Sequence, residues 1–129
     1  MFFRRKEIPW EVVDSRSVDP VSMYYDNDNE DFELVSVKDT KVRRKYVLEV
    51  KRDMVGRSEL PKALVFARGQ LLQEVNKNGY NILLNESWRV TLLRKAKLHR
   101  VEIEYSGRPA LVLNEPLVQH PPFLAVLAS

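Results

Sequence analysis

One apolar stripe, set between strand-like runs, limits most strongly the folds that this chain can adopt. The stripe consists of Leu60, Leu64, Ala67, Leu71 and Val75. Its spacing of four, three, four and four residues is typical of an amphipathic helix. Glu59 suits the first turn and Gly79 offers a left-handed cap, so the sequence predicts a helix over residues 59–78. Strand patterns before and after this helix predict an α+β fold in which the helix covers one face of a sheet.

The strand patterns lie on both sides of the helix. Residues 32–37 and 45–50 are strand-like runs separated by charged residues, which predicts a β-hairpin. Residues 80–85 follow the helix as a short strand of the buried type. Residues 101–118 are interpreted as a second hairpin with Gly107 at its turn. We therefore expect a mixed sheet of about five strands.

The two remaining segments are less regular. Residues 1–25 contain short extended runs broken by prolines and are interpreted as an arm or an edge strand. Residues 86–99 are ambiguous, because Trp88, Leu92 and Ala96 fit a helix whereas Val90 and Leu92 also suit a strand. We favour a second helix there.

Length and composition narrow the classes of protein to consider. The length of 129 residues predicts one domain over 1–129. The composition, with 44% apolar and 30% charged residues, is typical of globular proteins. With 21 basic against 18 acidic residues, the net charge of +3 permits a nucleic-acid partner without demanding one. The absence of cysteine excludes disulfides and thiolate catalysis. We expect no signal peptide and no membrane span, and hence a soluble, intracellular protein in the cytoplasm or a virion.

A Glu-x-Lys pair, Glu49 and Lys51, closes the strand-like run that begins at Lys45. In metal-dependent nucleases a strand ending in Glu-x-Lys follows an acidic residue at another strand end, and a helix lies behind the sheet. Asp31, the Glu-x-Lys pair and the helix from Glu59 occur in this order. The alternative is that Glu49 and Lys51 form an ordinary solvated ion pair on a strand.

Residues 30–86 resemble the PD-(D/E)xK nuclease superfamily. The segments "DFELVSVKD", "KYVLEVK" and "NGYNILLNE" are similar to the core of transposon end-cutting endonuclease subunits and of phage head-completion nucleases. The resemblance implies Mg²⁺-dependent DNA processing, with Asp31 and Glu49 as metal ligands and Lys51 as the catalytic lysine. Such nucleases usually place a further acidic residue upstream, for which Glu7 and Glu11 are the candidates.

Basic residues and an apolar tail favour an alternative function, a non-enzymatic subunit of a virion or ribonucleoprotein. The candidates for contacts with the phosphates of DNA or RNA are Arg43, Arg44, Lys45, Arg89, Arg94, Lys95, Lys97 and Arg100. The same charges could instead form a solvated surface. Within the apolar tail at 119–129, Phe123–Ser129 either docks on a partner protein or covers this protein's own core.

Overall fold

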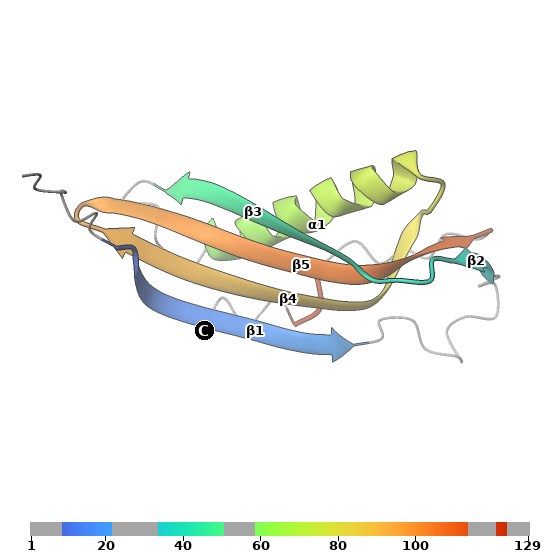
Figure 1. Cartoon of the computed structure of the whole chain (residues 1–129), viewed down its shortest axis with the longest axis horizontal. Helices are drawn as coiled ribbons and strands as arrows, with labels where there is room; N and C mark the ends of the chain where they lie inside the picture. Colours follow the sequence, from blue (N-terminus) through green and yellow to red (C-terminus); the bar gives the residue numbers. More distant parts are fainter. Residues whose placement is uncertain (1–8, 22–33, 51–58, 114–120, 124–129) are drawn as a thin grey trace, which may run out of the picture.

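The computed structural model describes residues 9–21, 34–50, 59–113 and 121–123, and it contains a curved sheet with one helix laid across it (Figure 1). The elements within these ranges are β1 (Glu11–Val21), β2 (Leu34–Val37), β3 (Val42–Val50), α1 (Glu59–Lys77), β4 (Ile82–Lys95) and β5 (Leu98–Val112). These elements confirm the predicted α+β fold with five strands and a helix. None of the described residues belongs to a helix of the length and apolar character that a membrane crossing requires.

The sheet is built around the long strands β4 and β5. β1 pairs with β4, β4 pairs with β5, and both β2 and β3 pair with the other edge of β5. All four described pairings are antiparallel, so the sheet is antiparallel and not mixed. β1 is an edge strand, in agreement with one of the two interpretations of residues 1–25.

Both predicted hairpins are wrong. β2 and β3 follow one another along β5 because this 15-residue strand is long enough to pair with both. Gly107 lies inside β5 and not at a turn. A Cβ atom on Gly107 would lie 3.0 Å from the Cβ of Leu83, so a side chain there would crowd Leu83. The observed tight turn joins β4 to β5, where Ala96 adopts a φ of 54°.

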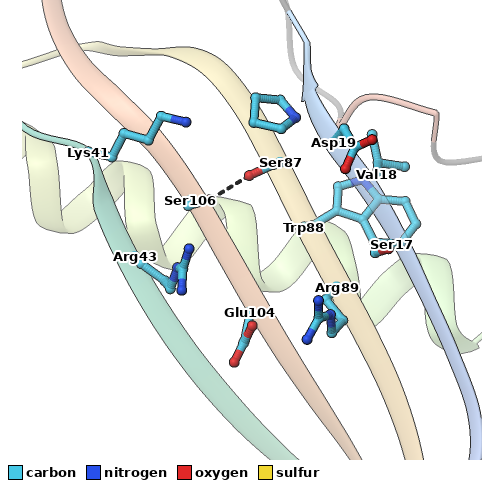
Figure 2. Close-up of a pocket in the computed structure, with 11 residues that line it drawn as sticks. Ser17, Val18, Asp19, Lys41, Arg43, Ser87, Trp88, Arg89, Glu104 and Ser106 are labelled. Carbon is cyan, nitrogen blue, oxygen red and sulfur yellow. Dashed lines mark hydrogen bonds between the residues drawn. The ribbon is translucent and has the colours of Figure 1, made fainter.

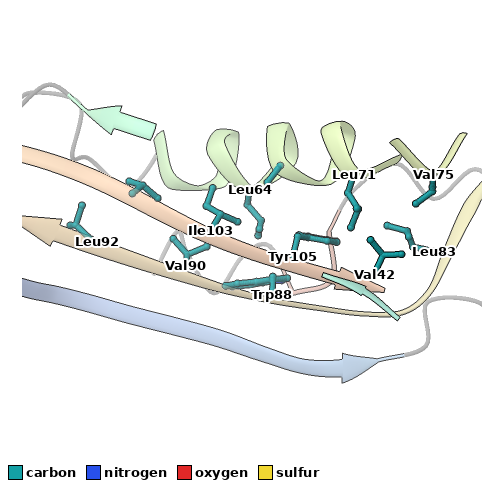
Figure 3. Packing of buried hydrophobic residues seen from close by; sticks show 12 residues of the cluster. Val42, Leu64, Leu71, Val75, Leu83, Trp88, Val90, Leu92, Ile103 and Tyr105 are labelled. Atoms are coloured by element: carbon teal, nitrogen blue, oxygen red, sulfur yellow. The ribbon is translucent and has the colours of Figure 1, made fainter. Parts of the chain in front are cut away.

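The second helix predicted over residues 86–99 is also wrong. These residues form most of β4, the turn after it and the start of β5. β4 pairs with β1 on one side and with β5 on the other, so both edges of its backbone are satisfied by sheet hydrogen bonds. Trp88, Val90 and Leu92 alternate with more polar residues and face α1 (Figure 3).

Helix α1 agrees with its prediction. Leu64, Ala67, Leu71 and Val75 are buried, and Leu60 packs at the margin of the core. Gly79 follows the helix with a φ of 94°, the left-handed conformation that glycine adopts without strain. Across this interface the stripe meets inward side chains of β4 and β5, among them Ile103 and Tyr105 (Figure 3).

A β-bulge in β4 changes which side chains face the helix. Between Leu84 and Ser87 the register with β5 shifts by one residue, and Asn85 adopts a φ of 52°. Before the bulge Leu83 faces the core, whereas after it Glu86 and Trp88 do. Side chains alternate along a strand, so one extra residue inverts the inward and outward positions that follow it.

The bulge places the carboxylate of Glu86 in the core. Glu86 is 0% exposed and accepts hydrogen bonds from Arg68 Nε at 2.6 Å and Arg68 Nη2 at 3.2 Å. The Tyr105 hydroxyl donates to the same carboxylate at 2.6 Å. Burial, and then the charge of Glu86, raises the pKa of Tyr105 well above its ordinary value of 10.0, so the phenol keeps the proton that it donates. These three side chains, the buried polar cluster, join α1 to β4 and β5.

Leu71→Ala tests the position of the core. Because Leu71 is 0% exposed, its truncation should lower the free energy of unfolding by about 2–5 kcal/mol. Urea denaturation would measure the loss, with Gln73→Ala on the exposed side of the same helix as the control. An unchanged denaturation midpoint in Leu71→Ala would contradict the packing described here.

Glu86→Gln tests the buried polar cluster. Removing the charge while keeping the shape leaves the Arg68 guanidinium buried without this carboxylate, which should cost about 3–5 kcal/mol. The paired variant Arg68→Met with Glu86→Leu removes both charges and should recover much of that loss. Denaturation midpoints of the three proteins give the comparison. A Glu86→Gln protein as stable as the parent would show that the cluster does not hold helix and sheet together.

Candidate nucleic-acid interface

The side of the sheet opposite α1 carries a group of polar and charged side chains. The alternation of β3, β4 and β5 places one set of side chains on it, which we call the outer face: Arg43, Lys45, Val47, Glu49, Ser87, Arg89, Thr91, Leu93, Lys95, Arg100, Glu102, Glu104 and Ser106. Cross-strand register aligns them in rows, such as Lys45, Glu104 and Arg89. The outer face is therefore a charged surface on a rigid support.

Part of this charge is neutralised locally. Lys45 Nζ lies 3.2 Å from Glu102, and Arg100 Nη2 lies 3.1 Å from the same carboxylate. The guanidinium of Arg100 also stacks 4.2 Å from the centre of the Trp10 ring, and Lys95 Nζ lies 5.9 Å from it. Glu102 therefore has two cationic partners, and Arg100 is held between a carboxylate and an aromatic ring.

The charge that remains gathers at a pocket of about 260 Å³ near the bulge (Figure 2). Arg43 of β3 and Arg89 of β4 flank it, and Glu104 of β5 lies between them. Ser87 and Ser106 share a hydrogen bond of 2.5 Å between their hydroxyl groups in the same pocket. Lys41 adds a cation and Asp19 an acidic group to its lining.

Arg43 and Arg89 are the two arginines of the pocket. Both are exposed, and neither forms an ion pair with any carboxylate in the described part of the chain. A guanidinium presents a planar set of N–H donors that matches two oxygens of a phosphate. The pocket can thus bind an anion from two sides.

The eight basic residues predicted to contact phosphates lie in different parts of the structure. Five of them lie on the outer face: Arg43, Lys45, Arg89, Lys95 and Arg100. Arg44 turns toward the helix and pairs with Glu74 at 2.9 Å. Arg94 pairs with Glu11 of β1 at 3.1 Å, and Lys97 lies in the turn between β4 and β5.

Of the two predicted metal ligands and the predicted catalytic lysine, Glu49 alone is described, and Asp31 and Lys51 lie outside the described residues. Glu49 is exposed and pairs in register with Arg100. Leu34, the first residue of β2, pairs with Val112, twelve positions further along β5. At 3.3–3.4 Å per residue, the start of β2 and the end of β3 are about 40 Å apart along the strand. Nowhere in the described ranges do three histidine, aspartate or glutamate side chains form a group that could hold a metal ion.

The start of the predicted apolar tail packs against the protein itself. Pro121 and Pro122 are buried, and Trp88 Nε1 donates a hydrogen bond of 2.8 Å to the carbonyl oxygen of Pro122. Phe123 is 60% exposed with a φ of 51°. Residues 124–129 lie outside the described residues, so docking of this end on a partner stays a prediction.

Sequence reasoning missed several residues of the pocket. Ser87, Glu104 and Ser106 enter it only through the register of β4 with β5. The alternation of polar and apolar residues from Ser87 to Leu92 was the signal that could have placed Ser87 and Arg89 on one face. Nothing in the sequence signals that Glu104, unlike Glu102, has no cationic partner among the described residues.

Comparisons of this chain with family models, with curated proteins and with solved structures found no match. Its function is therefore inferred from the arrangement of its own residues.

Proposed function

We propose that this protein binds nucleic acid through its outer face, as a subunit of a larger nucleoprotein assembly. The observation that carries the proposal is the pair Arg43 and Arg89, two exposed guanidinium groups without a described carboxylate partner that flank one pocket. Lys41 lines the same pocket. These cations match the most general feature of nucleic acids, a backbone of regularly spaced phosphates.

The number of unpaired cations determines how strongly this binding should depend on salt. The whole chain carries only +3, and two of the outer-face cations, Lys45 and Arg100, already share an ion pair with Glu102. A protein that contacts few phosphates with free cations binds with a shallow salt dependence, because few counterions are released. We therefore expect binding that depends only weakly on salt and is carried mainly by Arg43 and Arg89.

The competing hypothesis is the Mg²⁺-dependent nuclease with Asp31, Glu49 and Lys51. The separation of about 40 Å along β5 between the start of β2 and the end of β3 favours binding over cleavage, because metal ligands must converge on one cation. The binding proposal needs no metal ion and uses side chains that already share a pocket.

Arg43→Ala and Arg89→Ala should each weaken binding to a labelled single-stranded oligonucleotide at low salt. Each lost phosphate contact should also lower the slope of log affinity against log salt by about 0.7. Fluorescence anisotropy over a salt series measures both quantities. Lys62→Ala is the matched control, because it removes one exposed positive charge from α1 on the opposite side of the sheet. Equal losses in Lys62→Ala and the arginine variants would refute a site on the outer face.

A nicking assay separates binding from cleavage. With supercoiled plasmid and Mg²⁺, the binding proposal predicts intact plasmid at protein concentrations that saturate the oligonucleotide. Mg²⁺-dependent nicking that disappears in Lys51→Ala and in Glu49→Gln would establish the nuclease hypothesis instead.

A further inference from the structure

Glu104 is the feature of the outer face that phosphate binding leaves unexplained. Its neighbours in register are Lys45 on β3 and Arg89 on β4, yet Lys45 bonds Glu102 instead. Among the described residues no cation lies within ion-pair distance of Glu104. A partly buried carboxylate thus lines the pocket between two arginines, with its acceptor capacity unused.

A carboxylate at this position affects different nucleic acids in different ways. The backbone of DNA offers only acceptor oxygens, so a carboxylate beside it contributes repulsion. RNA carries a 2′-hydroxyl on every sugar, and this group donates a hydrogen bond. An ionised carboxylate is an acceptor only, so the 2′-hydroxyl is the backbone group that complements it.

The serine pair adds a donor for the phosphate. One of the hydroxyls of Ser87 and Ser106 donates to the other, and the accepting hydroxyl keeps its own proton for a further acceptor. The pocket therefore combines cations, a hydroxyl donor and a carboxylate acceptor. At about 260 Å³ it is somewhat below the usual size of small-molecule sites, about 300–1,000 Å³, which suits one sugar–phosphate unit of a chain.

We propose that this pocket selects RNA over DNA: Arg43 and Arg89 hold a phosphate while Glu104 accepts a hydrogen bond from the adjoining 2′-hydroxyl. This inference rests on the proposed function and names the class of nucleic acid bound at the same site. Glu104 acts as the specificity residue, and its negative charge lowers the affinity for DNA. The arginines contribute equally to both nucleic acids, because both have phosphates.

The test uses three single strands of one uracil-containing sequence: ribose, deoxyribose and 2′-O-methyl ribose. The unchanged protein should bind the ribose strand on the order of ten times more tightly than the other two, since each lacks the hydroxyl proton. The 2′-O-methyl strand requires no protein variant, so misfolding cannot confuse the result. Equal affinities for all three strands would overturn the inference and leave the proposed function standing, whereas absence of binding to every strand would overturn both.

Variants then assign the discrimination to one side chain. Glu104→Ala should weaken binding of the ribose strand, strengthen binding of the deoxyribose strand and bring their ratio close to one. Glu59→Gln removes a carboxylate charge from the first turn of α1, on the other side of the sheet, and should leave the ratio unchanged. Circular dichroism checks that each variant is folded. A ratio retained in Glu104→Ala, or lost equally in Glu59→Gln, contradicts the role of Glu104.

Discussion

The packing of helix α1 on the sheet depends on the buried carboxylate of Glu86. A charge that is 0% exposed persists in a core only when its hydrogen bonds are satisfied, and here Arg68 and Tyr105 satisfy them. Glu86 reaches them because the bulge at Asn85 adds one residue to β4 opposite Gly107. The buried polar cluster thus ties the middle of α1 to the sheet. It also fixes which side chains of β4 face the helix and which face the opposite side.

The orientation of the β4 side chains in turn determines which residues lie on the outer face. With the extra residue, Trp88, Val90 and Leu92 pack under α1, while Ser87 and Arg89 turn to the opposite side. Without it the same strand would aim Arg89 into the core and Trp88 at solvent. The pocket between Arg43 and Arg89 therefore depends on the β-bulge that places Glu86 in the core. This link explains why the candidate site lies beside the bulge (Figure 2).

The helix was predictable from sequence because its stripe repeats over four turns, and the fold class followed from it. The sequence did not predict that residues 86–95 form a strand or which of their side chains face the helix. Trp88, Leu92 and Ala96 are four residues apart, a spacing that suits both a helix and a strand. The decisive residue, Glu86, looks like a surface position, since its partners are distant in sequence. The basic residues were recognised as a set, but pairing of Arg44 with Glu74 depends on tertiary contacts that spacing cannot reveal.

Chemical-shift mapping of the isotope-labelled protein during titration with a single-stranded oligoribonucleotide would show directly whether RNA binds to the outer face. Backbone and arginine Nε signals report each position separately, so the two sides of the sheet can be compared in one sample. Binding at the outer face should shift signals mainly at Arg43, Ser87, Arg89, Glu104 and Ser106 and leave the signals of α1 nearly unmoved. Shifts concentrated on α1, or saturation without any change on the outer face, would contradict it.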